Sequence, residues 1–193
     1  MYYFAYGSNI NQIQMSIRMG AHLSQMVGWG YWKDHQLVFR GTERLGHYYT
    51  CIHDLSGTHQ VPMLCYKIDE EGEKLMDKCE GIDGGFYHKE IIEIGINTPM
   101  GTYRKVRGIT YVMNDCVESA PAEKGMPDVK YVARVLMGYI NNEMPPIYIE
   151  QSLCEAGSEL IARKVWESAL ELVQGAPLDL IDTQALIGAQ RII

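Results

Sequence analysis

The chain has 193 residues, of which 47% are hydrophobic, and a formal net charge of −7 at pH 7. This length fits one domain, or one domain with an appendage, and the composition supports a buried core. The acidic balance argues against nucleic acid or an anionic membrane as the main partner, but it allows a small anion held by a local group of backbone N–H donors.

The N-terminal residues 2–6 are aromatic and apolar and predict a short strand. Gly7, Ser8 and Asn9 interrupt it, and Ser8 or Asn9 can cap the helix expected at 10–19. A strand that ends in glycine and runs into a helix start directs several backbone N–H groups at one point, which suits a carboxylate or an oxyanion. The other interpretation of this motif is a plain strand-to-helix turn.

The middle of the chain is rich in strand patterns. Residues 69–79 predict a short helix, with Asp69 as its N-cap and acidic side chains in its first turn. A glycine-rich loop spans 80–85. Strands are expected at 27–33, 36–39, 48–52, 62–68, 86–96 and 108–113.

Glu80 stands between that helix and the glycine-rich loop. A carboxylate placed there can face a cavity with little crowding, and burial raises its pKa so that it can shuttle a proton. The alternative is a solvated acid at a helix C-terminus, where a negative charge is unfavourable. Both interpretations stay open on the residues alone.

The chain becomes helical after Pro127. Helices are expected at 129–142, 147–153 and 158–173, and the segment after Gly175 shows no clear pattern. We therefore expect an α+β fold: a small mixed or antiparallel β-barrel with flanking helices and a helical C-terminal extension. Residues 1–145 would form the domain, with 146–193 packed on it rather than folding separately.

The cysteines and histidines give little sign of a metal or a redox centre. No CxxC pair exists and the histidine spacings match no common metal motif, so we expect no metal and no cofactor. Free thiols fit a reducing compartment. The chain lacks a signal-peptide pattern and any apolar run of about 18 residues, so we expect a cytoplasmic protein without membrane association. Cys79 with His53 or His88 as its base would be a cysteine hydrolase, but a small buried thiol fits better.

Taken together, these features resemble the gamma-glutamylcyclotransferase-like (AIG2-like) family. Residues 3–9 (YFAYGSN) resemble its N-terminal signature, and 80–87 (EGIDGGFY) resemble its acidic signature. The stretch 111–113, then Glu118-Ser119-Ala120-Pro121, then 127–131 with Gly138, is similar to its third block. The order and approximate spacing agree over residues 2–145.

The resemblance implies a barrel-centred α+β fold with a cavity at one end, and Glu80 as the catalytic acid/base. It also implies a substrate site formed by Tyr3, Phe4, Ala5, Tyr6, Gly7, Ser8, Asn9 and Tyr131. The sequence departs from the family where 123–126 lengthen the link to Tyr131, and where 146–193 have no counterpart. Both departures lie where the leaving group could be selected.

The implied activity is the release of 5-oxoproline, with an amine or amino acid, from a small-molecule gamma-glutamyl substrate by a monomer or homodimer. Two alternatives share the fold and the pocket. One is an enzyme that releases an amine from a gamma-glutamylated metabolite instead of an amino acid from a dipeptide. The other is a non-catalytic small-molecule binding module.

Overall fold

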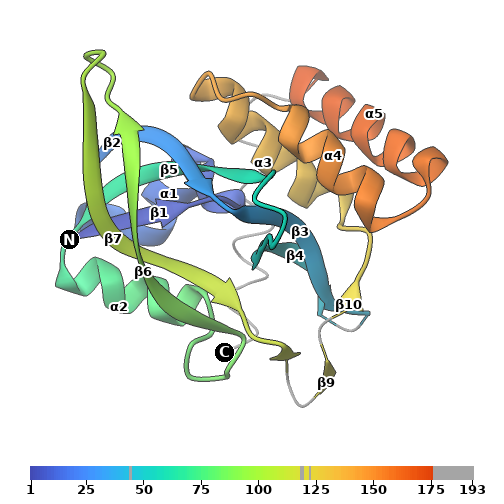
Figure 1. Ribbon diagram of the computed structural model, residues 1–193, viewed down its shortest axis with the longest axis horizontal. Helices are drawn as coiled ribbons and strands as arrows, with labels where there is room; N and C mark the ends of the chain where they lie inside the picture. The colour runs from blue at the N-terminus through green and yellow to red at the C-terminus, as the bar shows by residue number, and fades with distance from the viewer. Residues whose placement is uncertain (44, 118–119, 122, 176–193) are drawn as a thin grey trace.

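The computed structural model describes residues 1–43, 45–117, 120–121 and 123–175 (Figure 1). Two residues of the third family block, Glu118 and Ser119, lie outside the described residues. The last 18 residues of the expected C-terminal extension, 176–193, also lie outside them.

The centre of the molecule is a closed barrel with the strand order β1-β5-β2-β6-β7. Its neighbours pair antiparallel, except that β1 and β7 meet in parallel between Tyr3 and Ile109. The mixed barrel expected from the sequence is therefore confirmed. The strands are β1 (Tyr2–Ala5), β2 (Leu23–Lys33), β5 (Gln60–Ile68), β6 (Tyr87–Asn97) and β7 (Tyr103–Met113).

A second, three-stranded sheet lies beside the barrel. Its order is β10 (Glu123–Lys124), β3 (His35–Thr42) and β4 (Gly46–His53). The stretch that lengthens the link to Tyr131 thus supplies β10, which pairs with β3 at Gly41 and Arg40. Two short strands, β8 (Cys116–Val117) and β9 (Ala120–Pro121), pair with each other.

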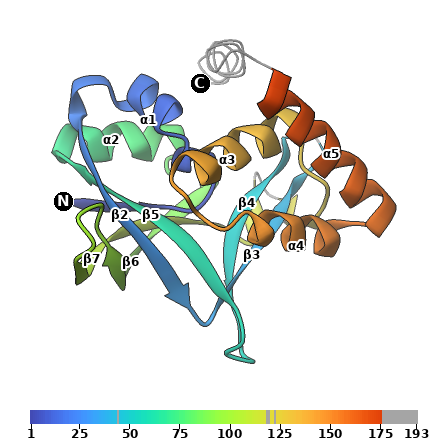
Figure 2. The ribbon, with the colours of Figure 1, turned by 90° about the horizontal axis from the view of Figure 1, so that it is seen from above.

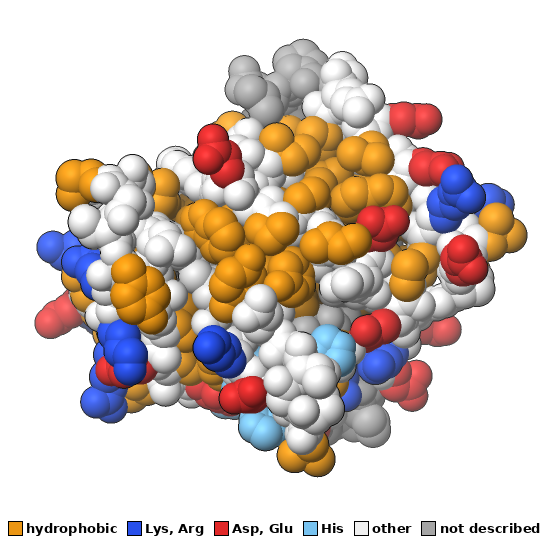
Figure 3. Space-filling model, turned by 45° about the horizontal axis from the view of Figure 1, so that its top comes forward, with side chains coloured by type: hydrophobic (Ala, Val, Ile, Leu, Met, Phe, Trp, Pro, Cys, Tyr) orange, Lys and Arg blue, Asp and Glu red, His pale blue; other side chains and the backbone are white. Residues whose placement is uncertain are grey.

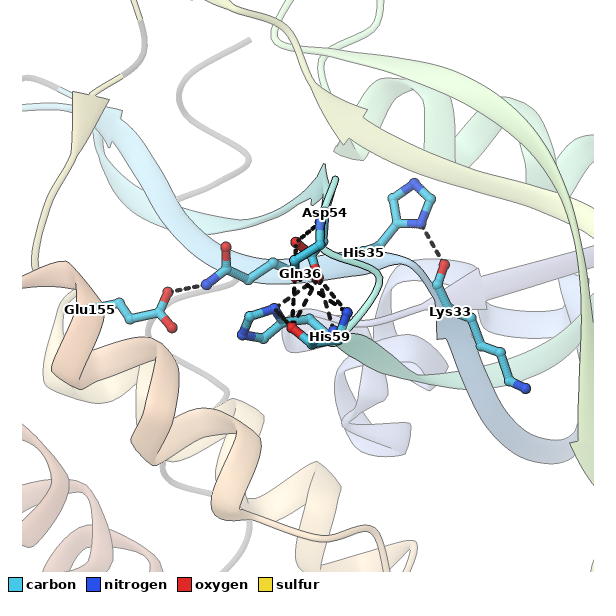
Figure 4. A network of polar contacts seen from close by, with 8 residues as sticks. Lys33, His35, Gln36, Asp54, His59 and Glu155 are labelled. Atoms are coloured by element: carbon cyan, nitrogen blue, oxygen red, sulfur yellow. Dashed lines mark hydrogen bonds and ion pairs between the residues drawn. The ribbon is translucent and has the colours of Figure 1, made fainter.

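The turn after β4 is stabilised by Asp54. Its carboxylate accepts hydrogen bonds from the backbone N–H groups of Ser56, Thr58 and His59, and it lies 2.9 Å from His59 Nδ1 (Figure 4). These bonds hold the pKa of Asp54 below its ordinary value, with the Ser56 side chain as the largest cause. The arrangement belongs to the exposed turn itself, because each partner comes from within five residues.

Two helices lie side by side at one end of the barrel (Figures 1 and 2). They are α1 (Gln12–Met19) and α2 (Glu70–Cys79). Asp69 caps α2 as predicted, because its Oδ1 accepts from the Gly72 N–H at 2.7 Å. Short 3-10 turns, η1 (Ser8–Ile10) and η2 (Gly20–His22), flank α1.

The predicted cap of the first helix was wrong. Ser8 and Asn9 lie in η1, and the N-cap of α1 is Asn11, whose Oδ1 accepts from the N–H groups of Ile13 and Gln14. The Asn9 side chain is engaged elsewhere, so it is not available to satisfy the first N–H groups of the helix.

Three helices cover the other side, in agreement with the predicted positions. They are α3 (Val129–Asn141), α4 (Ile147–Ala156) and α5 (Glu159–Gly175). Helix α3 packs between η1 and α5, and α4 packs on β3, where Ser152 Oγ donates to the Leu37 carbonyl (Figure 2). Hydrophobic side chains gather near the middle of the face in Figure 3, with charged groups towards its edges. No helix in the described ranges is long and apolar enough to span a membrane.

Candidate active site

The side chain of Asn9 is the centre of a buried polar network between β1, α1 and α2. It is only 5% exposed. Its Nδ2 donates to the Tyr3 hydroxyl at 2.8 Å and to Glu80 Oε1 at 2.9 Å. Its Oδ1 accepts from Arg18 Nη1 at 2.8 Å and from Gln14 Nε2 at 3.0 Å. All four hydrogen-bonding positions of the amide are therefore filled.

The backbone beside Asn9 is fixed as well. Tyr66 donates its hydroxyl to the Asn9 carbonyl at 3.0 Å, and Gln14 Nε2 donates to Ser8 Oγ at 2.9 Å. Gln14 and Tyr66 are themselves buried, so these bonds form inside the core. The turn that follows β1 is thus held from the barrel on one side and from α1 on the other.

Glu80 joins this network from the C-cap of α2. The region formed by Asn9, Glu80 and their partners Tyr3, Gln14 and Arg18 is called the corner. Its side chain is 15% exposed, and Arg18 Nη1 lies 3.8 Å from Oε1. Burial raises the pKa of Glu80 above its ordinary value, while the Arg18 charge and the Asn9 hydrogen bond act in the opposite direction. Of the two alternatives left open by the sequence, the buried carboxyl is the one found. A carboxyl group with a raised pKa suits the uptake and release of a proton during a reaction.

The glycine-rich loop after Glu80 has the backbone that its composition predicts. Gly81 and Gly85 adopt φ values of +64° and +71°, which L-residues with side chains rarely occupy. The Gly81 carbonyl accepts from the Phe86 N–H at 3.0 Å and closes the loop. The chain therefore turns sharply after Glu80 and places Tyr87 at the start of β6.

The turn from Gly7 to Asn9 carries free donors. Within the described residues, the backbone N–H groups of Gly7, Ser8 and Asn9 donate to no protein acceptor. A Cβ added at Gly7 would lie 3.0 Å from the Tyr131 hydroxyl, so glycine lets this strand end approach α3 closely. Adjacent unpaired N–H groups form a site for an anionic oxygen.

Tyr131 is held where α3 meets the second sheet. Its hydroxyl accepts from the Tyr49 N–H at 3.1 Å. Burial raises its pKa, and the charge of Glu80 raises it further, while the bond from Tyr49 lowers it. The hydroxyl is therefore protonated at neutral pH, and its proton is available as a donor.

Further tyrosines surround the corner. Tyr6 donates to the Tyr111 carbonyl at 2.5 Å, Tyr87 donates to the Tyr49 carbonyl at 2.9 Å, and Tyr111 donates to Asp77 Oδ1 at 2.7 Å. Burial raises the pKa of each of these three hydroxyls, with the charge of Glu80 among the lesser causes. Glu80 therefore faces neutral hydroxyls instead of competing anions.

The structure brings most of the predicted site residues together. Asn9 and Glu80 are in direct contact, Tyr3 joins them through Asn9, and Gly7 lies against Tyr131. By contrast, the side chains of Phe4 and Ala5 are buried in the core cluster, at 0% and 1% exposure. They support β1 from within, so only their backbone is near the turn.

Two members of the network were missed from the sequence, Gln14 and Arg18. Both come from α1, and nothing in their local pattern marks them as partners of Asn9 or Glu80. A basic residue near the C-terminus of a short helix is ordinary, because it interacts well with the helix dipole. Only the packing of α1 beside α2 shows that Arg18 reaches the carboxylate.

Two cavities of the described structure lie away from this network. One, of about 310 Å³, opens between β4 and β7 and is lined by residues such as Arg40, His53, His88 and Glu90. The other, of about 450 Å³, lies between α4 and α5 beside Trp166. Across the described ranges, no three His, Cys, Asp or Glu side chains gather closely enough to hold a metal ion.

Comparison with known proteins gives a consistent result. The family model described as "Gamma-glutamyl cyclotransferase, AIG2-like" matches residues 3–132. A solved structure of a gamma-glutamyl cyclotransferase is similar with a TM-score of 0.61 and 22% sequence identity, over 86% of this chain and 98% of that chain. A search of curated proteins found no match.

Two further solved structures share the fold. An uncharacterized protein from Homo sapiens has a TM-score of 0.60 and 23% identity, over 86% of this chain and 97% of its own. YkqA from Bacillus subtilis has a TM-score of 0.63 and 19% identity, over 82% of this chain and 54% of its own. At these identities, the likeness shows a common architecture.

Proposed function

Because the chain belongs to the gamma-glutamyl cyclotransferase, AIG2-like family, we propose that it converts a gamma-glutamyl compound into 5-oxoproline and releases the amine or amino acid attached to it. The observation that carries the proposal is the Glu80 carboxyl group. It is buried, its pKa is raised, and Asn9 Nδ2 holds one of its oxygens at 2.9 Å. A group in this state can act as both acid and base.

The reaction is an intramolecular aminolysis. The α-amine of the glutamyl group attacks its own γ-carbonyl carbon, a C–N bond closes the five-membered lactam, and the C–N bond to the leaving amine breaks. Two protons leave the attacking nitrogen and two reach the leaving nitrogen, so the protein ends unchanged. In this proposal Glu80 transfers these protons one at a time between the two nitrogens.

The turn from Gly7 to Asn9 supports the binding half of the proposal. Its unpaired N–H groups suit either the α-carboxylate of the glutamyl group or the oxyanion that develops on the γ-carbonyl. The Tyr131 hydroxyl, beside Gly7, is a further donor to the same region. Together these groups would hold the glutamyl half of the substrate in a folded shape.

The proposed reaction needs few further protein groups, because the nucleophile and the electrophile belong to the same molecule. Because the reacting groups are already joined, the protein has only to restrict the rotations of the glutamyl chain, which is a smaller task than uniting two separate molecules. General acid–base catalysis adds a factor of about 10²–10⁴. The proposal therefore gives the main role to the Glu80 carboxyl group and to the donors that hold it and the substrate.

Product analysis tests the proposal. The protein is incubated with a panel of gamma-glutamyl dipeptides and gamma-glutamylamines, and mass spectrometry measures 5-oxoproline and the released amine. We expect equal amounts of the two products from at least one member of the panel. Release of glutamate would indicate a hydrolase, and tight binding without consumption would indicate a binding module. Either result would overturn the proposal.

A cysteine-dependent reaction finds no support in the geometry. Cys79 is exposed and not the buried thiol that the sequence suggested, but partial loss of hydration still raises the pKa of its thiol and disfavours the nucleophilic thiolate. The two histidines that could serve as its base, His53 and His88, line the cleft between β4 and β7. We therefore expect thiol alkylation to leave turnover intact.

A further inference from the structure

Arg18 makes two contacts in the corner that contains Glu80. Its Nη1 donates to Asn9 Oδ1 at 2.8 Å and lies 3.8 Å from Glu80 Oε1. The side chain is 21% exposed, so the guanidinium group is largely withdrawn from solvent. A charged donor in such a place forms stronger hydrogen bonds than a neutral one.

The orientation of the Asn9 amide depends on Arg18 and Gln14. Both donate to Oδ1, so a flipped amide would set its NH₂ group against two other donors. With Oδ1 fixed in this way, Nδ2 must point to the Tyr3 hydroxyl and to Glu80. The donor that holds Glu80 is thus set by residues that form no hydrogen bond with Glu80.

Glu80 is held by one oxygen only. Asn9 and Arg18 both approach Oε1, and within the described residues no hydrogen bond is made to Oε2. An acid/base group needs one oxygen fixed, to set its direction, and one oxygen free, to carry the proton. The network around Asn9 provides this asymmetry.

We infer that Arg18 is a positioning residue that acts through Asn9 to fix Oε1 of Glu80 and to leave Oε2 free for the proton. The inference rests on the proposed function for its catalytic meaning, but its physical content concerns the carboxyl group alone. Arg18 acts twice, as a hydrogen-bond donor that orders Asn9 and as a charge that favours ionised Glu80.

Among the groups around Glu80, Arg18 does most to oppose the effect of burial on the pKa of its carboxyl group. Within the described residues, Arg18 is the cation in contact with the carboxylate. The other titratable groups that sense its charge are neutral near pH 7: Cys79 on α2, Tyr3 and Tyr6 at β1, Tyr87 on β6, Tyr111 on β7 and Tyr131 on α3. Removing Arg18 leaves burial unopposed by charge, so the pKa of Glu80 must rise.

The test is an NMR titration of the Glu80 δ-carbon, assigned by its loss in Glu80→Gln. We expect Arg18→Gln and Arg18→Met to raise the pKa of Glu80 by about one unit or more, the usual effect of losing an opposite charge at this distance. Arg18→Lys keeps the charge, so the pKa of Glu80 in this variant should lie close to its wild-type value. The matched control is Arg163→Gln, which removes an exposed arginine on α5 paired with Glu167 and should change nothing.

A pKa of Glu80 that is unchanged in Arg18→Gln and Arg18→Met would overturn the inference. Failure of both variants to fold, judged by circular dichroism, would assign Arg18 to stability and overturn it equally. Because the titration needs no substrate, it stands apart from the proposed activity. With an active protein, Arg18→Gln should also lower kcat about tenfold or more and move the acidic limb of the pH profile upward.

Discussion

Two polar regions of this molecule differ in how their side chains are hydrogen-bonded. In the corner around Asn9, the amide fills every hydrogen-bonding position and holds Glu80. The cleft between β4 and β7 has a volume of about 310 Å³ and contains three histidines, Arg40 and Glu90. Its groups form separate pairs: His88 lies 2.8 Å from Asn114 Oδ1 and 3.3 Å from Glu90 Oε1, and Arg40 Nη1 lies 3.8 Å from a fully exposed Asp115. Among the described residues, the buried Arg40 Nε has no hydrogen-bond partner.

The volume of a cavity is therefore a poor guide to where a reactive group lies in this fold. A reactive carboxyl group needs a fixed direction and a perturbed pKa, and both come from burial and from ordered partners. The corner provides them, whereas the cleft provides volume and exposed charge. Substitutions in the corner should therefore have larger effects than matched substitutions placed elsewhere.

The largest effect should follow Glu80→Gln. The substitution keeps the shape and removes the proton carrier, so turnover should fall by about 10²–10⁴-fold while substrate still binds. The control is Glu90→Gln in the cleft, which should alter turnover less than about twofold. Steady-state kinetics with the best gamma-glutamyl substrate measures both, and equal losses in the two variants would remove the distinction between corner and cleft.

The next effect should follow Asn9→Leu. It leaves the donors of Gln14 and Arg18 and the hydroxyl of Tyr3 without their partner inside the core. An unsatisfied buried polar group costs about 1–3 kcal/mol, so urea denaturation should show a loss of unfolding free energy at least that large. Gln36→Ala, which removes an amide that donates to Glu155 at the surface (Figure 4), should cost under about 0.5 kcal/mol.

The sequence was informative where the chemistry is local. The aromatic strand β1, the Asp69 cap of α2 and the position of Glu80 at the end of that helix all follow from short patterns. The strand predicted at 108–113 was too short. Strand β7 begins at Tyr103, in a charged stretch whose side chains face solvent. That exposed half gives no apolar alternation until Val106.

Contacts between distant segments could not be read from the sequence. Arg18 and Glu80 are 62 positions apart, and they meet only because α1 and α2 pack side by side. The cap of α1 was misplaced for a related reason. Ser8, Asn9 and Asn11 are all suitable N-cap residues. The Asn9 amide bonds to Tyr3 and Glu80 instead, and Asn11 caps the helix.

A smaller effect should follow Tyr131→Phe. It removes the acceptor of the buried Tyr49 N–H, so stability should fall by about 1 kcal/mol, and turnover should fall less than in Glu80→Gln. Tyr139→Phe, on the same helix, is the control. Within the described structure the buried Tyr139 hydroxyl has no partner, so its removal should be neutral or slightly stabilising. A turnover loss in Tyr131→Phe as large as that of Glu80→Gln would reverse the assigned roles.

The smallest effect concerns stability and pH. The pKa of Glu80 is raised in the folded protein, so the folded state binds this proton more tightly than the unfolded state. Its contribution to stability is therefore greatest at low pH and is lost as pH rises through the raised pKa. Glu80→Gln stays neutral throughout, so its Tm relative to the wild type should rise from pH 4 to pH 8. A flat difference for Glu80→Gln would contradict a buried carboxyl group.

The most direct measurement is a crystal structure of the Glu80→Gln variant with a gamma-glutamyl substrate bound. We expect substrate density at the turn from Gly7 to Asn9. There the glutamyl carboxylate or γ-carbonyl oxygen would lie on the free N–H groups, with the reacting nitrogen beside residue 80. A substrate bound in the cleft between β4 and β7, with the corner empty, would show that the corner is not the active site.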